Sequence, residues 1–312
     1  MPELYKIWEK NGFKESGNWE DIFGSGVQTD EIFMAWYYAK YVNRLAEAGK
    51  KIYQLPMYVN AALNRPNRLP GIGYPSAGPL PHLMDIWKAA GNSIDFLAPD
   101  IYFPNFKYWC DLYVRQGDPL FIPEHKNDNT APFKGMFAIG HYNTLGFSPF
   151  SIESTAEPEN NPLGKIYNII TQLSLLITEN QPTGKVEGVL LNKQHKDTTI
   201  IMGKYILNIR HDYTLGWGVD TAAIDSWPLS SAIIIQTSEN EFYFGGTGIV
   251  ATFKSATNND LNIGILKVDE GKFENAKWKI LLHLNGDETH QGRHLRIPYG
   301  QYSIQRIELY QY

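Results

Sequence analysis

The segment Pro119–Asp128, which reads PLFIPEHKND, places a carboxylate where an apolar run ends. Leu120–Pro123 has the composition of a buried strand, Glu124 follows it directly, and a polar loop comes next. A carboxylate at the end of a strand is held at the rim of a sheet, where α/β barrels carry their catalytic groups. Glu124 is therefore a candidate catalytic residue. The simpler alternative is a solvated side chain that merely ends a strand.

Polar residues recur at the ends of three other predicted strands. These strands and the residues at their ends are Ile52–Val59 with Asn60, Ile94–Ala98 with Asp100 and Tyr102, and Phe147–Ile152 with Ser151 and Glu153. The strand bodies stay apolar while the polar groups return at the same end. This regularity predicts one polar face at the carboxyl edge of a parallel sheet, as expected for a catalytic site.

Helical patterns separate the four strands. They cover residues 30–49, 82–90, 106–115, 133–145 and 161–180. The first helix has an apolar stripe at spacings of three and four, which predicts its buried side. That stripe consists of Phe33, Trp36, Tyr37, Tyr41 and Leu45. Four strand–helix units in a row predict a parallel sheet built from βαβ crossovers.

The pattern of apolar residues changes after Pro182-Thr183-Gly184. The helical period ends, and from Val186 short apolar runs alternate with Gly, Asn and Asp. Many short strands at regular spacing are typical of a β-sandwich. The predicted fold class is α/β followed by all-β. The boundary lies near Gln181–Lys185, and the expected domains are residues 1–182 and 183–312.

Composition limits the classes of function. Of the 312 residues, 43% are hydrophobic and 20% are charged, which is typical of a globular protein. The net charge of −5 argues against nucleic acid or an anionic membrane as a partner. The single cysteine, Cys110, excludes an internal disulfide and a cysteine-based metal site. The start, MPELYKIWEK, does not have the apolar core of a signal peptide, and no apolar run is long enough to span a bilayer.

The motifs favour carboxylate chemistry in an aromatic cleft. Nucleotide-binding glycine patterns are absent at strand-to-helix turns, the histidines lack metal-site spacing, and there is no GxSxG elbow. We therefore expect no cofactor and no metal. Glycoside hydrolysis needs two carboxyl groups, roughly 5–5.5 Å apart in retaining enzymes. Glu124 is the best single candidate. Asp100 or Glu153 could be the second carboxylate, could bind a sugar hydroxyl, or could orient the site.

Four segments resemble the second half of the barrel in family 35 glycoside hydrolases. They are PLFIPEHKND, APDIY (98–102), LPMYVNAAL (55–63) and AIGHYNTLGFSPFSIES (138–154), and together they most resemble the bacterial β-galactosidase-like branch with its own C-terminal β domain. The resemblance implies strands 5–8 of a (β/α)8 barrel. It also implies a retaining mechanism on β-galactosides in oligo- or polysaccharides, and a periplasmic or secreted bacterial parent protein.

The resemblance also implies roles for individual residues. Glu124 matches the nucleophile, and Tyr102 matches a tyrosine that hydrogen-bonds to the nucleophile. Asn60 falls in the segment that lines the sugar site, and Ser151–Glu153 closes the cleft. The acid/base Glu of the family stands in an Asn-Glu pair at the end of strand 4, and no such pair precedes residue 30. The resemblance thus implies a chain that begins after strand 4, is weakly active alone, and is completed by an N-terminal half-barrel chain or by self-association.

Two other classes of function stay open at the level of sequence. One is a non-catalytic carbohydrate-binding protein, a degenerate barrel that holds sugar through Tyr102, Trp109 and the loop 60–81. In that case the β region would be an additional binding module. The other is a purely structural role for residues 184–312, packed beside the barrel. The substitution Glu124→Gln separates catalysis from binding, because it removes the nucleophile and keeps the shape of the side chain.

Overall fold

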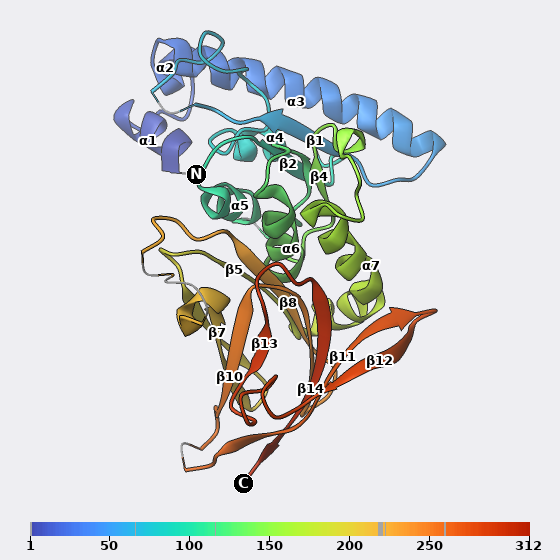
Figure 1. Ribbon diagram of the computed structural model, residues 1–312. Coiled ribbons are helices and arrows are strands. Elements are labelled where there is room, and N and C mark those ends of the chain that lie inside the picture. The colour runs from blue at the N-terminus through green and yellow to red at the C-terminus, as the bar shows by residue number, and fades with distance from the viewer. Residues whose placement is uncertain (1, 66, 116, 218–220, 222, 259) are drawn as a thin grey trace. The chain divides into compact units, whose positions relative to one another are not determined.

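The computed structural model describes residues 2–65, 67–115, 117–217, 221, 223–258 and 260–312, and most of its helices and strands are labelled in Figure 1. Contacts divide the chain into two compact units. Unit 1 consists of residues 1–126 and 145–150, and unit 2 of residues 127–144 and 151–312. The architecture is a parallel four-stranded sheet with helices, followed by two antiparallel sheets. The predicted change from α/β to all-β is therefore confirmed.

Unit 1 is built around the parallel sheet, whose strand order is β1-β2-β3-β4. Its strands are β1 (Tyr58–Ala62), β2 (Phe96–Ile101), β3 (Ile122–His125) and β4 (Phe147–Pro149). Its helices are α1 (Pro2–Lys10), α2 (Trp19–Phe23), α3 (Val27–Ile52), α4 (Met84–Ala89) and α5 (Phe106–Val114). Each strand pairs with the next one in the sequence, as the prediction of consecutive βαβ units requires.

Several predicted strand limits were wrong, and the shifts move the polar residues. Helix α3 continues to Ile52, so β1 begins only at Tyr58. Asn60, Asp100 and Glu124 therefore lie within the last residues of their strands rather than beyond them. The fourth strand ends at Pro149, which has no N–H to donate to a ladder. Glu153 accordingly lies in a short 3₁₀ helix, η1 (Ile152–Ser154), and not at the end of a strand.

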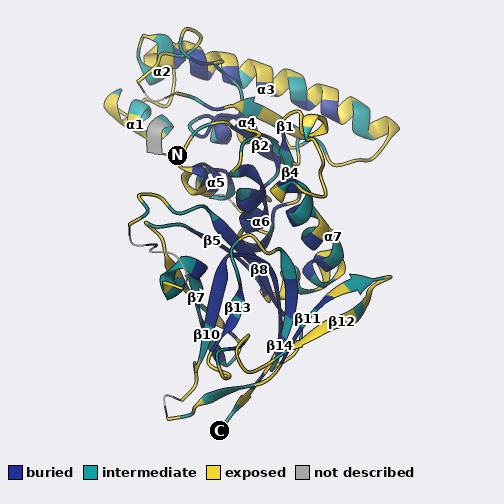
Figure 2. Cartoon of the chain, viewed as in Figure 1, coloured by how far each residue is buried: buried dark blue, intermediate teal, exposed yellow. Residues whose placement is uncertain are grey.

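The predicted buried face of α3 was also wrong. Its aromatic stripe is exposed: Phe33, Tyr37 and Tyr41 are 39%, 52% and 61% exposed, and Figure 2 shows a largely exposed outer side along this helix. The buried residues are Thr29, Glu31, Ile32, Ala35, Ala39, Asn43 and Ala46. Alanine lets a helix backbone approach its neighbour closely, so the narrow face packs inward and the bulky rings remain outside.

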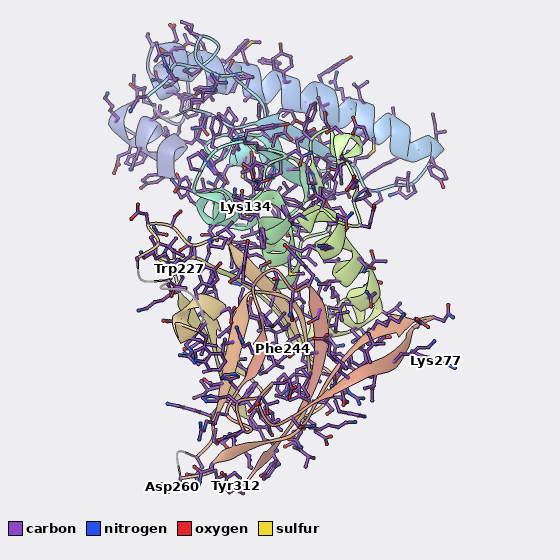
Figure 3. All side chains as sticks on the ribbon, in the orientation of Figure 1. Lys134, Trp227, Phe244, Asp260, Lys277 and Tyr312 are labelled. Carbon is purple, nitrogen blue, oxygen red and sulfur yellow. The ribbon has the colours of Figure 1, made fainter. Side chains whose placement is uncertain are left out.

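Unit 2 contains the two antiparallel sheets. The six-stranded sheet has the order β12-β11-β14-β9-β8-β5, and the four-stranded sheet has the order β13-β10-β7-β6. The strands are β5 (Val186–Leu191), β6 (Asp197–Met202), β7 (Tyr205–His211), β8 (Ser230–Gln236), β9 (Glu241–Thr247), β10 (Ile249–Ser255), β11 (Ile263–Glu274), β12 (Lys277–Leu284), β13 (Leu295–Ile297) and β14 (Ser303–Gln311). Both sheets contribute to one hydrophobic core that includes Tyr205, Phe244 and Ile249; Phe244 is labelled in Figure 3.

Two helices cover the other face of the six-stranded sheet. They are α6 (Ala131–His141) and α7 (Pro162–Asn180), and the short 3₁₀ helices η2 (Gln181–Thr183) and η3 (Asp212–Leu215) complete the unit. A second core cluster joins Met136 and Ile166 of these helices to Ile233 of the sheet. A Cβ atom on Gly140 would lie 2.6 Å from the Cα of Gly188, so both glycines are needed for the close approach of α6 to β5. The predicted domain limits, 1–182 and 183–312, stay a prediction.

Candidate active site

Strand register brings three of the predicted site residues to one face of the parallel sheet. Asp100 of β2 pairs with Glu124 of β3, and Asn60 of β1 pairs with Ala98, two residues before Asp100. Paired residues point to the same side, and so do residues two apart on one strand. Neighbouring strands lie about 4.8 Å apart, so Asn60, Asp100 and Glu124 form a row across the carboxyl half of the sheet.

Three hydrogen bonds orient the carboxylates of this row. The Nδ2 of Asn60 donates to both carboxylate oxygens of Asp100, at 2.8 Å and 3.0 Å. The hydroxyl of Tyr102 donates to Oε2 of Glu124 at 2.9 Å. Tyr102 follows Asp100 by two residues, so it reaches Glu124 from just beyond the end of β2. Both carboxylates are thus oriented by neutral donors, which fix their planes without adding a positive charge.

The environment shifts the pKa of two of these groups. Asp100 is only 7% exposed; burial and the charge of Glu124 raise the pKa of its carboxyl, against the opposing hydrogen bond from Asn60. Burial, the hydrogen bond to Glu124 and the charges of Glu124 and Asp100 raise the pKa of Tyr102 to about 12. Tyr102 therefore stays protonated across the neutral range and remains a donor to Glu124.

The exposed ring of Phe150 lies next to Tyr102, the hydrogen-bond partner of Glu124. Tyr102 is 39% exposed and Phe150 is 55% exposed, and their ring centroids are 6.5 Å apart. Phe150 is fixed by its backbone, because its N–H donates to the carbonyl of His125 at 2.9 Å. Phe150 was not among the predicted site residues. The segment SPFS contains it, but only the pairing of β3 with β4 shows that this ring is next to Tyr102.

The other predicted site residues are not part of this row. Trp109 belongs to the buried side of α5, is 7% exposed, and donates from Nε1 to the carbonyl of Pro104 at 3.1 Å, so little of its ring is free for stacking on a sugar. Ser151 and Glu153 belong to unit 2. There Ser151 precedes η1 with a φ of 55° and its carbonyl accepts a hydrogen bond from Ser154, while Glu153 is exposed.

The row offers carboxylate chemistry. Within the part of the chain that the structure describes, no group of three or more His, Cys, Asp or Glu side chains could hold a metal ion. No helix in the same residues is long and apolar enough to cross a membrane. What the geometry provides is one accessible carboxylate, Glu124, oriented through one oxygen by Tyr102 and adjacent to a buried carboxyl, Asp100.

Comparison with known proteins concerns unit 2. Residues 163–296 are similar to a family described as Domain of unknown function (DUF5597). This segment covers α7 and most of the antiparallel strands, and it excludes Asn60, Asp100, Tyr102 and Glu124. No curated protein matches the chain significantly. The matched segment contains none of the residues of the candidate active site. The site is therefore interpreted from its own geometry.

Proposed function

We propose that the chain carries the catalytic edge of a retaining glycoside hydrolase of β-galactosidase type, acting on β-galactosides in oligo- or polysaccharides. The observation that carries this proposal is the hydrogen bond from Tyr102 to Glu124 at the carboxyl end of a parallel sheet. The strand order β1-β2-β3-β4 steps one strand at a time in one direction, which is the winding of a (β/α)8 barrel. We assign these strands to positions 5–8 of such a barrel.

In this mechanism Glu124 is the nucleophile. Tyr102 occupies Oε2, which leaves Oε1 to attack the anomeric carbon. A bond forms between Oε1 and that carbon, and the glycosidic C–O bond breaks with its electron pair going to the leaving oxygen. Water then cleaves the glycosyl ester and restores the carboxylate, so the configuration at the anomeric carbon is retained. Asp100, held by Asn60, is assigned to binding a sugar hydroxyl.

Protonation of the leaving group limits the reaction. The carboxyl nearest to Glu124 in the sheet register is Asp100, and both of its oxygens already accept from Asn60. General acid assistance is worth about 10²–10⁴-fold. We therefore expect turnover of substrates with activated leaving groups and weak turnover of natural β-galactosides.

The first experiment compares the wild-type chain with Glu124→Gln on a dinitrophenyl and a methyl β-galactoside. Wild type should turn over only the activated substrate, should be accelerated by azide, and should yield the β-galactosyl azide. The variant should lose this activity. The matched control is Glu9→Gln, which changes an exposed carboxylate of the same unit and should behave as wild type.

Covalent trapping locates the nucleophile directly. A fluorinated galactoside with a dinitrophenyl leaving group should add one fluorogalactosyl group to the protein, and peptide mass spectrometry should place it on Glu124. A label on another residue, or undiminished turnover by Glu124→Gln, would contradict the proposal. Equal turnover of both aryl and methyl substrates would show that a second carboxyl group takes part, and Asp100→Asn and Glu153→Gln would then identify it.

A non-catalytic carbohydrate-binding protein is the second candidate. The exposed rings of Tyr102 and Phe150 favour it, because aromatic faces bind the C–H surfaces of sugars whether or not a reaction follows. In this case Glu124→Gln should leave sugar affinity unchanged, and no substrate should be turned over. Calorimetric titration of both forms with galactose, alongside the trapping experiment, separates the two functions.

A further inference from the structure

A cavity of about 360 Å³ lies in unit 1, outside the row that contains Glu124. Three segments build it: α1, the first turns of α3, and the chain that runs from the end of β1 to the start of α4. Its volume is within the range of small-molecule sites, roughly 300–1,000 Å³. Asn64, which lines the cavity, lies two residues after Ala62, the last residue of β1. The cavity is therefore at the carboxyl end of this strand, which is the end where ligands bind in parallel sheets.

The polar wall of the cavity is rigid. Glu31 is 4% exposed, and its carboxylate accepts hydrogen bonds from Nε2 of His82 at 2.8 Å, from the hydroxyl of Tyr74 at 3.3 Å and from the N–H of Ala77 at 3.4 Å. The loop itself is ordered by the N–H of Gly71, which donates to the carbonyl of Tyr74 at 3.0 Å. A buried carboxylate with several donors keeps one orientation, as a binding wall requires.

One acceptor in the wall lacks a partner. The Oδ1 of Asn64 is buried and has no hydrogen bond among the residues that the structure describes. Buried polar atoms are nearly always hydrogen-bonded, so an unsatisfied acceptor that lines a cavity indicates a donor supplied by a ligand or water. Since Glu31 is also an acceptor, the cavity favours a ligand that brings hydrogen-bond donors.

The charges around the cavity restrict that ligand further. Lys6 and Arg68 line the cavity and are exposed to solvent, so they disfavour an ammonium group. Leu69 and Leu83 add an apolar surface. Hydroxyl donors combined with C–H faces are the chemistry of a sugar ring.

The cavity is linked to the proposed catalytic row by the segment that follows β1. Asn60, which donates to Asp100, and Asn64, which lines the cavity, are four residues apart. Four extended residues span at most about 14 Å. We propose that the cavity is a subsite for a second sugar unit, on the leaving-group side of an oligosaccharide substrate. This assignment rests on the proposed function for its orientation, and it gives the sugar that follows the galactosyl unit a binding place of its own.

The test measures binding, so it does not depend on turnover. Wild type is titrated with galactose and with a sulfur-linked β-galactobiose, which resists hydrolysis. The second unit should raise affinity about tenfold or more. Asn64→Ala should remove the acceptor, and Leu69→Trp should fill the cavity from its exposed side; each should cancel that gain and leave galactose affinity unchanged. Asn92→Ala, an exposed asparagine outside the cavity, is the matched control.

Three results would overturn the subsite. The first is an unchanged affinity of both variants for the disaccharide. The second is an equal loss of affinity for galactose and for the disaccharide. The third is that folded wild type binds neither sugar. The binding test does not depend on catalysis, because the sulfur-linked disaccharide is not cleaved. A failure of the hydrolase proposal would appear only in the turnover and trapping experiments. An inactive protein whose disaccharide affinity falls in Asn64→Ala would keep the subsite and lose only catalysis.

Discussion

Asp100 and Glu124 of unit 1 are partnered in the opposite way to Asp269 of unit 2. In unit 1, Asp100 accepts from the amide of Asn60, and Glu124 accepts from the hydroxyl of Tyr102. In unit 2, Asp269 is fully buried and contacts the cations Arg306 at 2.8 Å and Lys267 at 2.9 Å, and also His283 at 2.5 Å. Neutral donors orient a carboxylate and keep its charge available, whereas cations neutralise it.

The pKa shifts follow from these partners. Burial raises the pKa of Asp269, but the hydrogen bonds from Arg306, Lys267 and His283 outweigh it, so the pKa lies below its usual value. The pKa of Asp100 is raised instead. An acid whose charge is not compensated costs stability at neutral pH, and such costs are found mostly at functional sites. Asp269 is therefore an acid that holds the fold together, whereas Asp100 and Glu124 remain candidates for the proposed chemistry.

The largest expected effect on stability belongs to unit 2. Asp269→Asn removes the negative charge that Arg306 and Lys267 face, and we expect a loss of about 3–5 kcal/mol in the free energy of unfolding. Denaturant titration measures it, with Asp287→Asn as the exposed control. Turnover of the dinitrophenyl substrate should not change below the transition. If Asp269→Asn lost activity and kept its stability, Asp269 would not be an acid that holds the fold together.

A second effect in unit 2 depends on pH. His294 is 3% exposed; burial and the neighbouring cationic groups His290, Arg296 and Arg210 lower its pKa to about 4, against the opposing charge of Asp212. A depressed pKa means that the contribution of neutral His294 to stability is present above pH 6.5 and is lost as the pH falls toward 4. The loss should reach at most about 3 kcal/mol.

Substitution of His294 isolates that pH dependence. His294→Leu should flatten the dependence of unfolding free energy on pH between 6.5 and 4. His195→Leu, at an exposed histidine of the same unit, should leave it as in wild type. Equal slopes for wild type and His294→Leu would show that His294 does not control acid stability.

In unit 1, Tyr102→Phe should affect the reaction more than the fold. It removes the hydrogen bond to Oε2 of Glu124. A hydrogen bond to a charged group is worth about 1.5–3 kcal/mol, so kcat for the activated substrate should fall roughly tenfold or more. The unfolding free energy should stay within about 0.5 kcal/mol. A larger change in stability than in kcat would assign Tyr102 to the fold.

The smallest effect is expected at Asp100. Its pKa is raised, so its stabilising contribution is present below pH 3.8 and is lost as the pH rises through the raised value. Asp100→Asn should therefore be neutral or stabilising at pH 7, by less than about 1 kcal/mol, and the difference from wild type should shrink in acid. Parallel melts at pH 7 and in acid measure it. If Asp100→Asn clearly destabilised the protein at pH 7, as Asp269→Asn is expected to do, the two acids would not differ in their contribution to stability.

Local sequence signals were sufficient where the residues that decide a structure are neighbours in the chain. Asn161 caps α7 by accepting from the N–H of Leu163, and Pro162 stands in the first turn, so the start of this helix was predicted correctly. The alternation of strands and helices up to residue 180, and of short strands after 186, likewise predicted the parallel sheet and the antiparallel sheets. Both patterns depend on spacing alone.

Other features depended on tertiary packing. The aromatic stripe of α3 has the spacing of a buried face, yet Ala35 and Ala39 pack inward because small side chains allow the closer approach. The importance of Glu31 was not visible in the sequence, since His82 lies 51 residues away and contacts it only in the fold. The same is true of Phe150, which the pairing of β4 with β3 brings beside Tyr102.

The sequence by itself determined the types of the catalytic candidates and the kind of strand that carries each of them. Glu124, Tyr102, Asp100 and Asn60 could all be named from strand ends and from a family resemblance. Only the tertiary structure decided which atoms meet: the register of β2 against β3 sets Asp100 opposite Glu124 and lets Tyr102 donate to it. The physical reason is that periodicity records which side of a strand is buried, whereas register is decided by contacts between distant segments.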